Sequence, residues 1–473
     1  MALAGSTVWR WVLFGIGLIT LALAVPTLWA IAKTGSGYKA KLLCSAVFVS
    51  GRSAESVLAE DVSVDGYESL RWFSQHIDRE KREVRASFFG LAGQRAVYRD
   101  GLGCTRIDNG VNSPRRVAFL GSNGNHNPDR STVLWPQGER VELDALPAGV
   151  DAAQLKHAID AAFDEPDPNC LRRTRALVVV YRGRIVAERY APGFDAAMPL
   201  LGWSMSKTAL NLLTGALVKR GKVSLDDAAS MPQWRNPGDP RAAISVDDLL
   251  RMSSGLQFDE DYSNELSDVV TMLFRSPDSG GFAADKPLLH RPGSHWHYSS
   301  GDSDILSAAL RRRANDLATY QTSPRTLLFE PLGMESAVFE TDASGSIVGS
   351  SFMYASARDW ARLGLLFLRD GVWEGKRVVP EGWVEYSLEP TPGSQGGRHG
   401  AHIWLKLRSA WDPDAPRFPE DAFFMQGHEH QVVAMIPSRD LAVVRLGLTR
   451  CPNAWEHASA LTPIVAAFPA VEN

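Results

Sequence analysis

An uninterrupted apolar stretch dominates the N-terminal part of the chain. Residues 11–32 (WVLFGIGLITLALAVPTLWAIA) carry no charged side chain, and Arg10 and Lys33 flank them. A helix of this length spans about 33 Å, against about 30 Å for the hydrocarbon core of a bilayer. The pattern predicts that residues 1–33 are a transmembrane anchor or an uncleaved signal, with residues 11–32 in contact with the lipid bilayer.

Two other interpretations of this stretch stay open. A secretory signal peptide has a shorter apolar core of about 7–15 residues, although Ala30-Ile31-Ala32 resembles a cleavage site. A buried core helix fits less well with so long and uniform a run. The orientation of the span across the membrane is also open. Three lysines follow the span and only one arginine precedes it, so the positive-inside rule would place the body of the protein on the inner side of the membrane. These residues are Arg10, Lys33, Lys39 and Lys41.

Strand-like patterns occur near both ends of the body of the chain. Residues 177–186 (LVVVYRGRIV) form two apolar runs around Arg182-Gly183. Residues 431–436 and 441–448 flank a second turn, Pro437-Ser438-Arg439-Asp440. Each pair of runs predicts a β-hairpin.

Helical patterns lie between these hairpins. Residues 206–220 and 355–368 place apolar side chains at helical spacing, and Ser356 is a suitable N-cap for the second helix. Strands at both ends with helices between them predict an α+β domain over residues 151–473, with an antiparallel β-sheet flanked by helices.

Residues 34–150 lack such regular patterns. Gly35-Ser36-Gly37 predicts a short flexible tether, and residues 83–98 predict strand-like stretches broken by glycines. We therefore expect an irregular extracytoplasmic spacer between the anchor and the body.

Composition narrows the class of protein. The 473 residues are 45% hydrophobic and 22% charged, which is typical of a folded globular protein. A net charge of −4 gives no basic surface for nucleic acid, so we expect no nucleic-acid partner.

Four cysteines bear on the compartment. They allow three pairings, of which we expect Cys44–Cys104 and Cys170–Cys451. Two disulfides would favour an oxidising compartment. On this evidence we expect a single-pass protein of the inner membrane whose body faces the periplasm or cell exterior.

The clearest candidate chemistry is Ser204-Met205-Ser206-Lys207 at the start of a predicted helix. Ser204 and Lys207 are three residues apart and share a helix face. Burial and the helix dipole both favour a neutral lysine amine, which can accept the serine proton. The tetrapeptide alone is weak evidence, because Ser36-Gly37-Tyr38-Lys39 has the same spacing without a helical pattern behind it.

A second segment strengthens this interpretation. Residues 291–301 (RPGSHWHYSSG) lead through a Pro-Gly turn to Tyr298. A tyrosine beside a protonated lysine is more easily deprotonated and can serve as general base and acid.

With these segments in place, residues 170–465 resemble the serine β-lactamase and penicillin-recognising superfamily. The nearest branch holds class C β-lactamases, carboxylesterases and 6-aminohexanoate-dimer hydrolase. The resemblance rests on six ordered segments: SMSK at 204–207, LLRMSSGL at 249–256, PGSHWHYSSG at 292–301, PLGM at 331–334, SSFMYASARDWARLGLLFL at 350–368 and GHEHQ at 427–431. It implies an all-helical subdomain beside the sheet.

The resemblance also implies roles for particular residues. Ser204 would be acylated by the substrate, Lys207 would activate it, and Tyr298 would relay protons. The third motif would lie on a strand edge along the cleft, where its backbone would complete an oxyanion hole with the Ser204 N–H. The expected oxyanion and substrate-cleft residues are Ser300, Gly427, His428, His430 and Gln431.

Two departures from the family pattern concern the substrate. The second motif is Tyr298-Ser299-Ser300, where β-lactamases commonly have Tyr-x-Asn. The third is His428-Glu429-His430, where they commonly have Lys-Thr-Gly or His-x-Gly. Losing that cation and glycine puts efficient β-lactam turnover in doubt, and the bulk of His430 would narrow the cleft.

The predicted function is hydrolysis of small-molecule esters or amides through an acyl-enzyme on Ser204, without a cofactor or metal. We rank esterase first, then linear amide hydrolase, then D,D-peptidase or β-lactamase. A non-catalytic penicillin-recognising binding or scaffold protein is an alternative. So is a metal-dependent hydrolase using the pairs His295/His297 and His428/His430, which on a strand would point to one side; neither pair completes a known zinc pattern.

Overall fold

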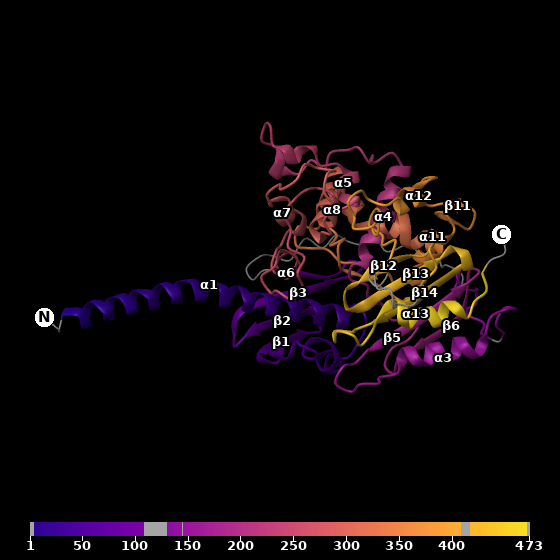
Figure 1. Ribbon diagram of the computed structural model, residues 1–473, viewed down its shortest axis with the longest axis horizontal. Helices are drawn as coiled ribbons and strands as arrows, with labels where there is room; N and C mark the ends of the chain where they lie inside the picture. Colours follow the sequence, from indigo (N-terminus) through magenta and orange to yellow (C-terminus); the bar gives the residue numbers. More distant parts are fainter. Residues whose placement is uncertain (1–3, 108–129, 144, 408–416, 471–473) are drawn as a thin grey trace.

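The computed structural model describes residues 4–107, 130–143, 145–407 and 417–470, except for the side chains of residues 4–12 and 14–23 (Figure 1). The first part of the chain forms one long helix, α1, and a small sheet. The remainder forms a body with a larger sheet and a helical region.

The body is built on a five-stranded antiparallel sheet in the order β12-β13-β14-β5-β6. Both predicted hairpins are confirmed: β5 pairs with β6 across Arg182-Gly183, and β13 pairs with β14 across residues 437–440. β14 then pairs with β5, so the two ends of the body meet in the middle of the sheet. The strands are β5 (Thr174–Tyr181), β6 (Arg184–Tyr190), β12 (Phe423–Gly427), β13 (Gln431–Ile436) and β14 (Leu441–Gly447).

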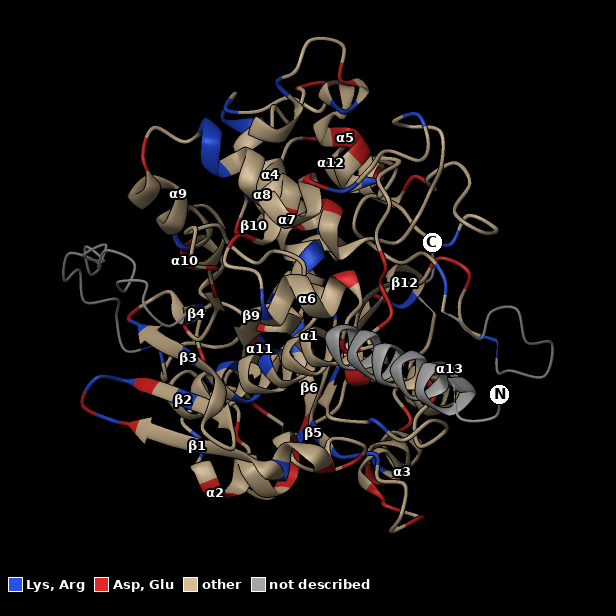
Figure 2. Cartoon of the chain, turned by 90° about the vertical axis from the view of Figure 1, so that its left-hand side faces the viewer, with Lys and Arg blue, Asp and Glu red and all other residues tan. Residues whose placement is uncertain are grey.

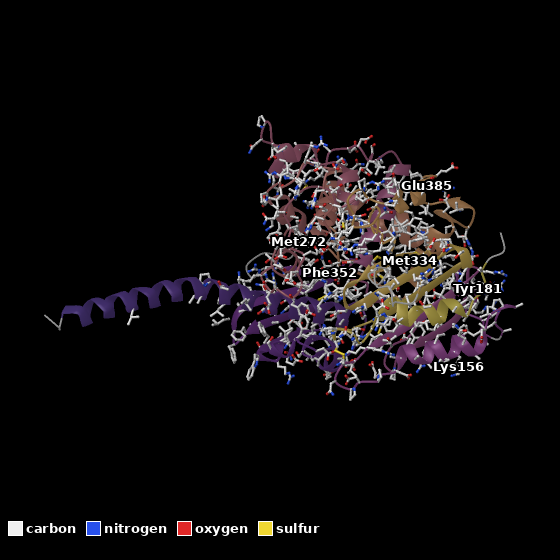
Figure 3. The ribbon with its side chains drawn as sticks, in the orientation of Figure 1. Lys156, Tyr181, Met272, Met334, Phe352 and Glu385 are labelled. Atoms are coloured by element: carbon white, nitrogen blue, oxygen red, sulfur yellow. A yellow bond between two sulfur atoms is a disulfide. The ribbon has the colours of Figure 1, made fainter. Side chains whose placement is uncertain are left out.

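Helices cover both faces of this sheet (Figure 1). Alternate residues of β5 point to opposite faces, so Leu177 and Val179 pack with α3 (Ala152–Phe163) and α13 (His457–Ala466). Val178 and Val180 belong to the opposite core with α11 (Ala357–Leu368), whose predicted N-cap Ser356 accepts from the Asp359 N–H. Tyr181, labelled in Figure 3, closes the first core against Phe468 with ring centroids 5.0 Å apart. The predicted α+β architecture is therefore confirmed.

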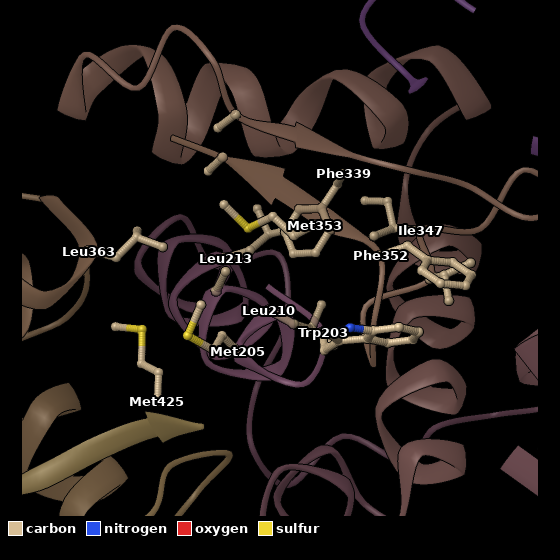
Figure 4. Close-up of a cluster of buried hydrophobic side chains, with 14 of the residues drawn as sticks. Trp203, Met205, Leu210, Leu213, Phe339, Ile347, Phe352, Met353, Leu363 and Met425 are labelled. Atoms are coloured by element: carbon tan, nitrogen blue, oxygen red, sulfur yellow. The ribbon is translucent and has the colours of Figure 1, made fainter. Parts of the chain in front are cut away.

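A helical region lies over the β12 edge of the sheet (Figure 1). Its central helix, α4, corresponds to the predicted helix 206–220, and its start packs in the core shown in Figure 4. The helices are α4 (Met205–Lys219), α5 (Val246–Leu250), α6 (Asp268–Phe274), α7 (Ser279–Ala284), α8 (Ser300–Arg313), α9 (Leu317–Pro324), α10 (Glu330–Leu332) and α12 (Trp383–Leu388). Short strands form two further small sheets, in the orders β7-β9-β8 and β10-β11. They are β7 (Leu200–Leu201), β8 (Val338–Phe339), β9 (Met353–Ala355), β10 (Val372–Trp373) and β11 (Lys376–Arg377).

The segment after the apolar stretch differs from the expected irregular spacer. It contains a four-stranded antiparallel sheet that packs against α1. The elements are α1 (Ala4–Phe48), α2 (Ala54–Val57), β1 (Phe73–Asp78), β2 (Glu83–Phe88), β3 (Leu91–Arg99) and β4 (Gly103–Ile107). Long-range packing of α1 against these strands outweighs the weak local pattern that favoured a spacer.

The expected flexible tether at residues 35–37 is wrong, because these residues lie inside α1. Their glycines serve close packing. A Cβ at Gly35 would lie 2.5 Å from the Phe73 ring, and one at Gly37 would lie 2.1 Å from the Phe274 carbonyl oxygen. Small residues here let the helix approach its neighbours, and packing offsets the low helix propensity of glycine.

Lys39 and Lys41 are buried in this interface rather than facing a membrane surface. The Lys39 ammonium donates to the carbonyl of Leu70 at 3.0 Å, and Lys41 forms an ion pair with buried Glu340. They therefore give no information on membrane orientation, and Arg10 and Lys33 are the remaining flanking charges of the predicted span.

Both expected disulfides are present. Cys44–Cys104 ties α1 to β4, and Cys170–Cys451 ties the start of β5 to the chain after β14. Within the part of the chain that the structure describes, we find no helix of the length and apolar character needed to cross a membrane. Within the apolar stretch 11–32, the structure does not describe the side chains of residues 11, 12 and 14–23.

Candidate active site

The predicted nucleophile follows a tight turn between β7 and α4. Trp203 has φ +49°, a left-handed conformation that a non-glycine residue adopts only when its surroundings hold it there. Its indole packs in the core (Figure 4), and its Nε1–H donates to Glu429 Oε2 at 3.0 Å. These contacts fix the direction in which Ser204 leaves the turn.

Ser204 and Lys207 are in contact. The Lys207 Nζ lies 3.0 Å from Ser204 Oγ, 3.0 Å from Ser300 Oγ and 2.9 Å from the Ser350 carbonyl oxygen. An ammonium group has three donors, so these three oxygens account for all of them. The lysine is 2% exposed, which isolates this polar cluster from bulk water.

The second motif supplies two neighbours of the lysine, Tyr298 and Ser300. The Lys207 Nζ lies 5.1 Å from the centroid of the Tyr298 ring, so the ammonium faces the ring. Ser300 begins α8, where Ser299 caps the helix by accepting from the Asp302 N–H. Ser300, expected in the substrate cleft, thus contacts Lys207 directly.

A half-buried carboxylate, that of Glu260, completes this cluster. Glu260 accepts the Ser300 N–H at 2.8 Å and the Ser300 hydroxyl at 2.5 Å. Burial raises the pKa of Glu260, while the Lys207 charge and the bonds to Ser300 partly oppose that rise. A hydrogen-bonded chain therefore runs from Ser204 through Lys207 and Ser300 to Glu260.

Two buried aspartates, Asp302 and Asp304, accept hydrogen bonds from serines near this hydrogen-bonded chain. Asp304 accepts the Ser350 N–H at 3.0 Å and so holds the carbonyl that binds Lys207. Asp302 accepts the Ser254 hydroxyl at 2.7 Å. Burial raises the pKa of Asp304 to about 8 and that of Asp302 to about 7. The serines of segments 249–256 and 350–368 therefore position the site.

The third motif forms a turn rather than a strand. β12 ends at Gly427, residues 428–430 turn with φ +59° at Glu429 and +64° at His430, and β13 starts at Gln431. The expectation that His428 and His430 share a strand face is therefore wrong. A hairpin between adjacent strands requires a reversal here, and the reversal separates the two rings.

The rings of the third motif have different surroundings. His428 stacks on Tyr262 with centroids 4.6 Å apart and meets Trp203 edge-on at 5.2 Å. Burial lowers the pKa of His428, so its ring is neutral at pH 7. The ring of His430 lies 5.5 Å from that of His457.

Gly427 and Gln431 support the geometry of the third motif through close packing and hydrogen bonds. A Cβ at Gly427 would lie 2.2 Å from the Gly202 carbonyl oxygen, so glycine lets the end of β12 approach the nucleophile turn. The buried Gln431 amide bridges the hairpin: its Nε2 donates to the Gly447 carbonyl and its Oε1 accepts the Gly447 N–H at 2.9 Å.

A buried ion pair stands behind the turn. Arg450 Nε donates to Glu429 Oε1 at 2.6 Å, and Arg450 Nη2 donates to the Tyr38 hydroxyl of α1 at 3.1 Å. Burial would raise the pKa of Glu429, but Arg450, His428 and the hydrogen bonds lower it below its usual value. α1 therefore connects to Trp203 through two side chains.

The histidines weighed as metal ligands are apart in the fold. His297 Nε2 lies 2.8 Å from the Phe258 carbonyl oxygen, and His295 stacks on His290 at 4.1 Å. Among the described residues, His, Cys, Asp and Glu side chains do not gather in threes as a metal site would require.

Sequence analysis missed Glu260 and Tyr262. A buried lysine needs a counter-charge, so an acidic partner for Lys207 was to be expected. The chain has 54 acidic residues and no motif marks Glu260, which is why local pattern could not select it.

An antiparallel sheet with a Ser-x-x-Lys helix start beside its edge strand defines the penicillin-recognising class of folds. The beta-lactamase family matches residues 159–452, more than half of the chain, and the chain belongs to that family. It is 28% identical over 227 residues to the 6-aminohexanoate-dimer hydrolase of Paenarthrobacter ureafaciens, covering 46% of this chain and 57% of that protein. The match thus spans little more than half of this curated relative.

Solved structures agree on the fold. A putative 6-aminohexanoate-dimer hydrolase from Bacillus anthracis has a TM-score of 0.51 at 21% identity, covering 66% of this chain and 80% of that chain. EstCE1, described as a hydrolase with promiscuous acyltransferase activity, has a TM-score of 0.53 at 16% identity, covering 67% and 97%.

Proposed function

We propose that the protein is a serine hydrolase that cleaves small-molecule esters or amides through an acyl-enzyme on Ser204. The observation that carries this proposal is the continuous chain from Ser204 Oγ through Lys207 and Ser300 to Glu260. Family membership and the hydrolases among the similar proteins support the same class of reaction.

The hydrogen-bond directions suggest how the serine loses its proton. Lys207 donates to Ser300 Oγ, and Ser300 donates to Glu260. A proton shifted along this chain leaves a neutral amine and a neutral carboxyl group, a state that burial favours for Glu260. The neutral amine then accepts the Ser204 proton as Oγ attacks the carbonyl carbon.

The remaining steps use the backbone and Tyr298. The N–H of Ser204 and one N–H from the turn 427–431 stabilise the oxyanion. The proton on Lys207 passes to the leaving group, with Tyr298 as relay beside the lysine. Water, activated by the same groups, releases the acyl product and restores Ser204.

The aromatic surroundings favour esters and linear amides over β-lactams. The third motif offers neutral His428 where many relatives of this fold have a cation, and Arg450 behind it is already paired with Glu429. Among the described residues of the third motif and its ion pair, a β-lactam carboxylate would therefore find no unpaired cation. We rank ester hydrolysis first and linear amide hydrolysis second.

We further propose that residues 11–32 anchor the protein in the inner membrane, with the body in the periplasm. The uncharged 22-residue stretch and the two disulfides support this arrangement. Carbonate extraction of membranes tests the anchor, since an integral protein stays in the pellet and a chain that is released contradicts it. Protease protection in spheroplasts tests the orientation.

The catalytic proposal is tested by intact-protein mass spectrometry of the full chain in detergent. We expect a stoichiometric adduct with a fluorophosphonate that Ser204→Ala abolishes, and a short-lived or absent adduct with penicillin. Folded protein without either adduct would instead favour a non-catalytic binding protein.

A further inference from the structure

An aromatic cluster with an unpaired arginine adjoins the catalytic tyrosine. Tyr298 stacks on Trp404 with centroids 5.2 Å apart and an interplanar angle of 25°. His399 meets both rings edge-on, at 5.9 and 4.9 Å. The Arg398 guanidinium carbon lies 5.6 Å from the Trp404 ring and 5.7 Å from the Trp296 ring. A single indole therefore connects this guanidinium to Tyr298.

The charge of Arg398 has no acidic partner among the residues that the structure describes. The other cations around the site are balanced: Lys207 reaches Glu260 through Ser300, and Arg450 pairs with Glu429. Arg398 is half-buried, and its charge makes cation–π contacts with the rings of Trp296 and Trp404. Such contacts contribute about 0.5–2 kcal/mol. A guanidinium in such a position can still bind a carboxylate with two parallel hydrogen bonds.

Unused hydrogen-bonding atoms collect in the same cluster. In the described structure, Arg398 Nε, Trp296 Nε1 and His399 Nδ1 are buried without a hydrogen-bond partner. His399 is 1% exposed. Burial lowers its pKa to about 3, and the charges of Lys207 and Arg398 add to that effect. Two of the three unused atoms, Arg398 Nε and Trp296 Nε1, are N–H donors suited to an anionic oxygen.

The segment that carries Arg398 is held firmly. Trp404 exchanges backbone hydrogen bonds with Phe424 of β12 at 3.0 and 2.7 Å, and Leu405 N donates to the Arg398 carbonyl at 2.8 Å. Thr208 of α4 donates to the His402 carbonyl at 2.7 Å. The backbone that carries Arg398 is thus fixed relative to both the sheet edge and the helix that bears Lys207, which is the support that a recognition group needs.

We propose that Arg398, supported by Trp296 and Trp404, forms a subsite for a carboxylate group of the substrate beside Tyr298. The inference rests on the proposed hydrolase function and narrows its substrates to esters or amides that carry a carboxylate away from the scissile bond. Arg398 is linked to Tyr298 of the second motif through Trp404, whereas the third motif presents the neutral ring of His428.

Matched nitrophenyl esters test this subsite. 4-Nitrophenyl butyrate is neutral, the mono-4-nitrophenyl ester of glutaric acid carries a carboxylate on the acyl side, and 3-carboxy-4-nitrophenyl butyrate carries one on the leaving group. We expect the full-length protein to prefer at least one anionic ester, judged by kcat/KM relative to the neutral ester. Arg398→Gln should lower that ratio at least tenfold and leave neutral-ester turnover within about twofold.

Two controls separate charge from structure. Arg291→Gln removes an exposed arginine from the second-motif segment and should leave the ratio unchanged. Fluorophosphonate labelling of Ser204 in Arg398→Gln should match the parent protein, because the arginine side chain makes no hydrogen bond to the residues that the structure describes.

The outcomes are distinct. A selective loss with either anionic ester supports the subsite and shows whether the acyl or the leaving group occupies it. An unchanged ratio for both anionic esters, in protein that still hydrolyses the neutral ester, overturns the subsite and leaves the hydrolase function standing. Failure of all three esters together with absent fluorophosphonate labelling overturns the hydrolase function and the subsite with it.

Discussion

Glu260 and Lys207 face each other across a single hydroxyl group, that of Ser300. The lysine donates to Ser300 Oγ at 3.0 Å, and Ser300 in turn donates to the half-buried glutamate. The hydroxyl thus separates two opposite charges that neither residue could carry alone at low cost in a buried site. This arrangement makes the protonation of Glu260 a determinant of the state of Lys207.

Replacing Glu260 with glutamine should lower kcat/KM for ester hydrolysis about a hundredfold or more. In the parent protein, kcat/KM should fall as the pH drops through the pKa of Glu260, which lies above its usual 4.5. The variant should lack this acidic limb. A pH profile of kcat/KM checks both points, with the exposed neighbour Asp259→Asn as control. An acidic limb that persists in Glu260→Gln would assign it to another group.

Replacing Gly427 with alanine should damage catalysis more than stability. The new Cβ would lie 2.2 Å from the Gly202 carbonyl oxygen and would push the end of β12 away from the nucleophile turn. We expect a loss of at least tenfold in kcat/KM, because oxyanion donors act only when accurately placed.

Gly364→Ala is the matched control for this variant. Its Cβ would meet a Val433 methyl group at 2.9 Å within the core between α11 and β13. Similar losses of activity in the two variants at similar melting temperatures would contradict a special role for Gly427.

The Glu429–Arg450 pair should make stability sensitive to acid. The pKa of Glu429 is lower in the folded protein than in the unfolded chain. The contribution of the pair to the free energy of unfolding is therefore complete above about pH 4.5, and it is lost as the pH falls through the pKa of Glu429 in the folded protein. Denaturant unfolding at pH 7 and pH 4 measures this loss.

Single and double variants isolate the pair. Arg450→Met alone leaves a buried carboxylate without its partner and should cost about 3–5 kcal/mol of unfolding free energy at pH 7. Glu429→Gln combined with Arg450→Met should cost less and should lose part of the acid dependence. An unchanged pH dependence in the double variant would locate the acid-sensitive group elsewhere.

The disulfide Cys44–Cys104 should stabilise the docking of α1. It closes a sequence separation of 60 residues, for which chain entropy predicts a contribution of about 4 kcal/mol. The double variant Cys44→Ser/Cys104→Ser should therefore unfold at lower denaturant concentration. Fluorophosphonate labelling of Ser204 under native conditions should persist, and its loss would mean that α1 docking is required for the active site.

Basic and acidic residues are interspersed on the side of the protein from which α1 emerges (Figure 2).

The elements predicted correctly were those specified by local pattern. The hairpins around Arg182-Gly183 and Pro437–Asp440, the helix capped by Ser356 and the contact of Ser204 with Lys207 each involve neighbours in the chain. Their spacing and turn residues are sufficient, because backbone geometry brings such neighbours together whatever the rest of the fold does.

Only the tertiary structure decided the features that depend on contacts across the chain. Residues 35–37 are helical because Phe73 and Phe274 accept a close approach by glycine, against the local preference for a tether. Glu260 and Arg398 carry no sequence signal, since each is defined by the residues around it. Glu260 reaches the buried Lys207 through Ser300. Arg398 lies over the rings of Trp296 and Trp404 without an acidic partner among the described residues. Local sequence thus determined the position of the candidate nucleophile Ser204 and of the elements that carry it. Long-range packing, which selects partners by shape and charge rather than by position in the chain, decided which groups meet Lys207, namely Ser300 and, through it, Glu260.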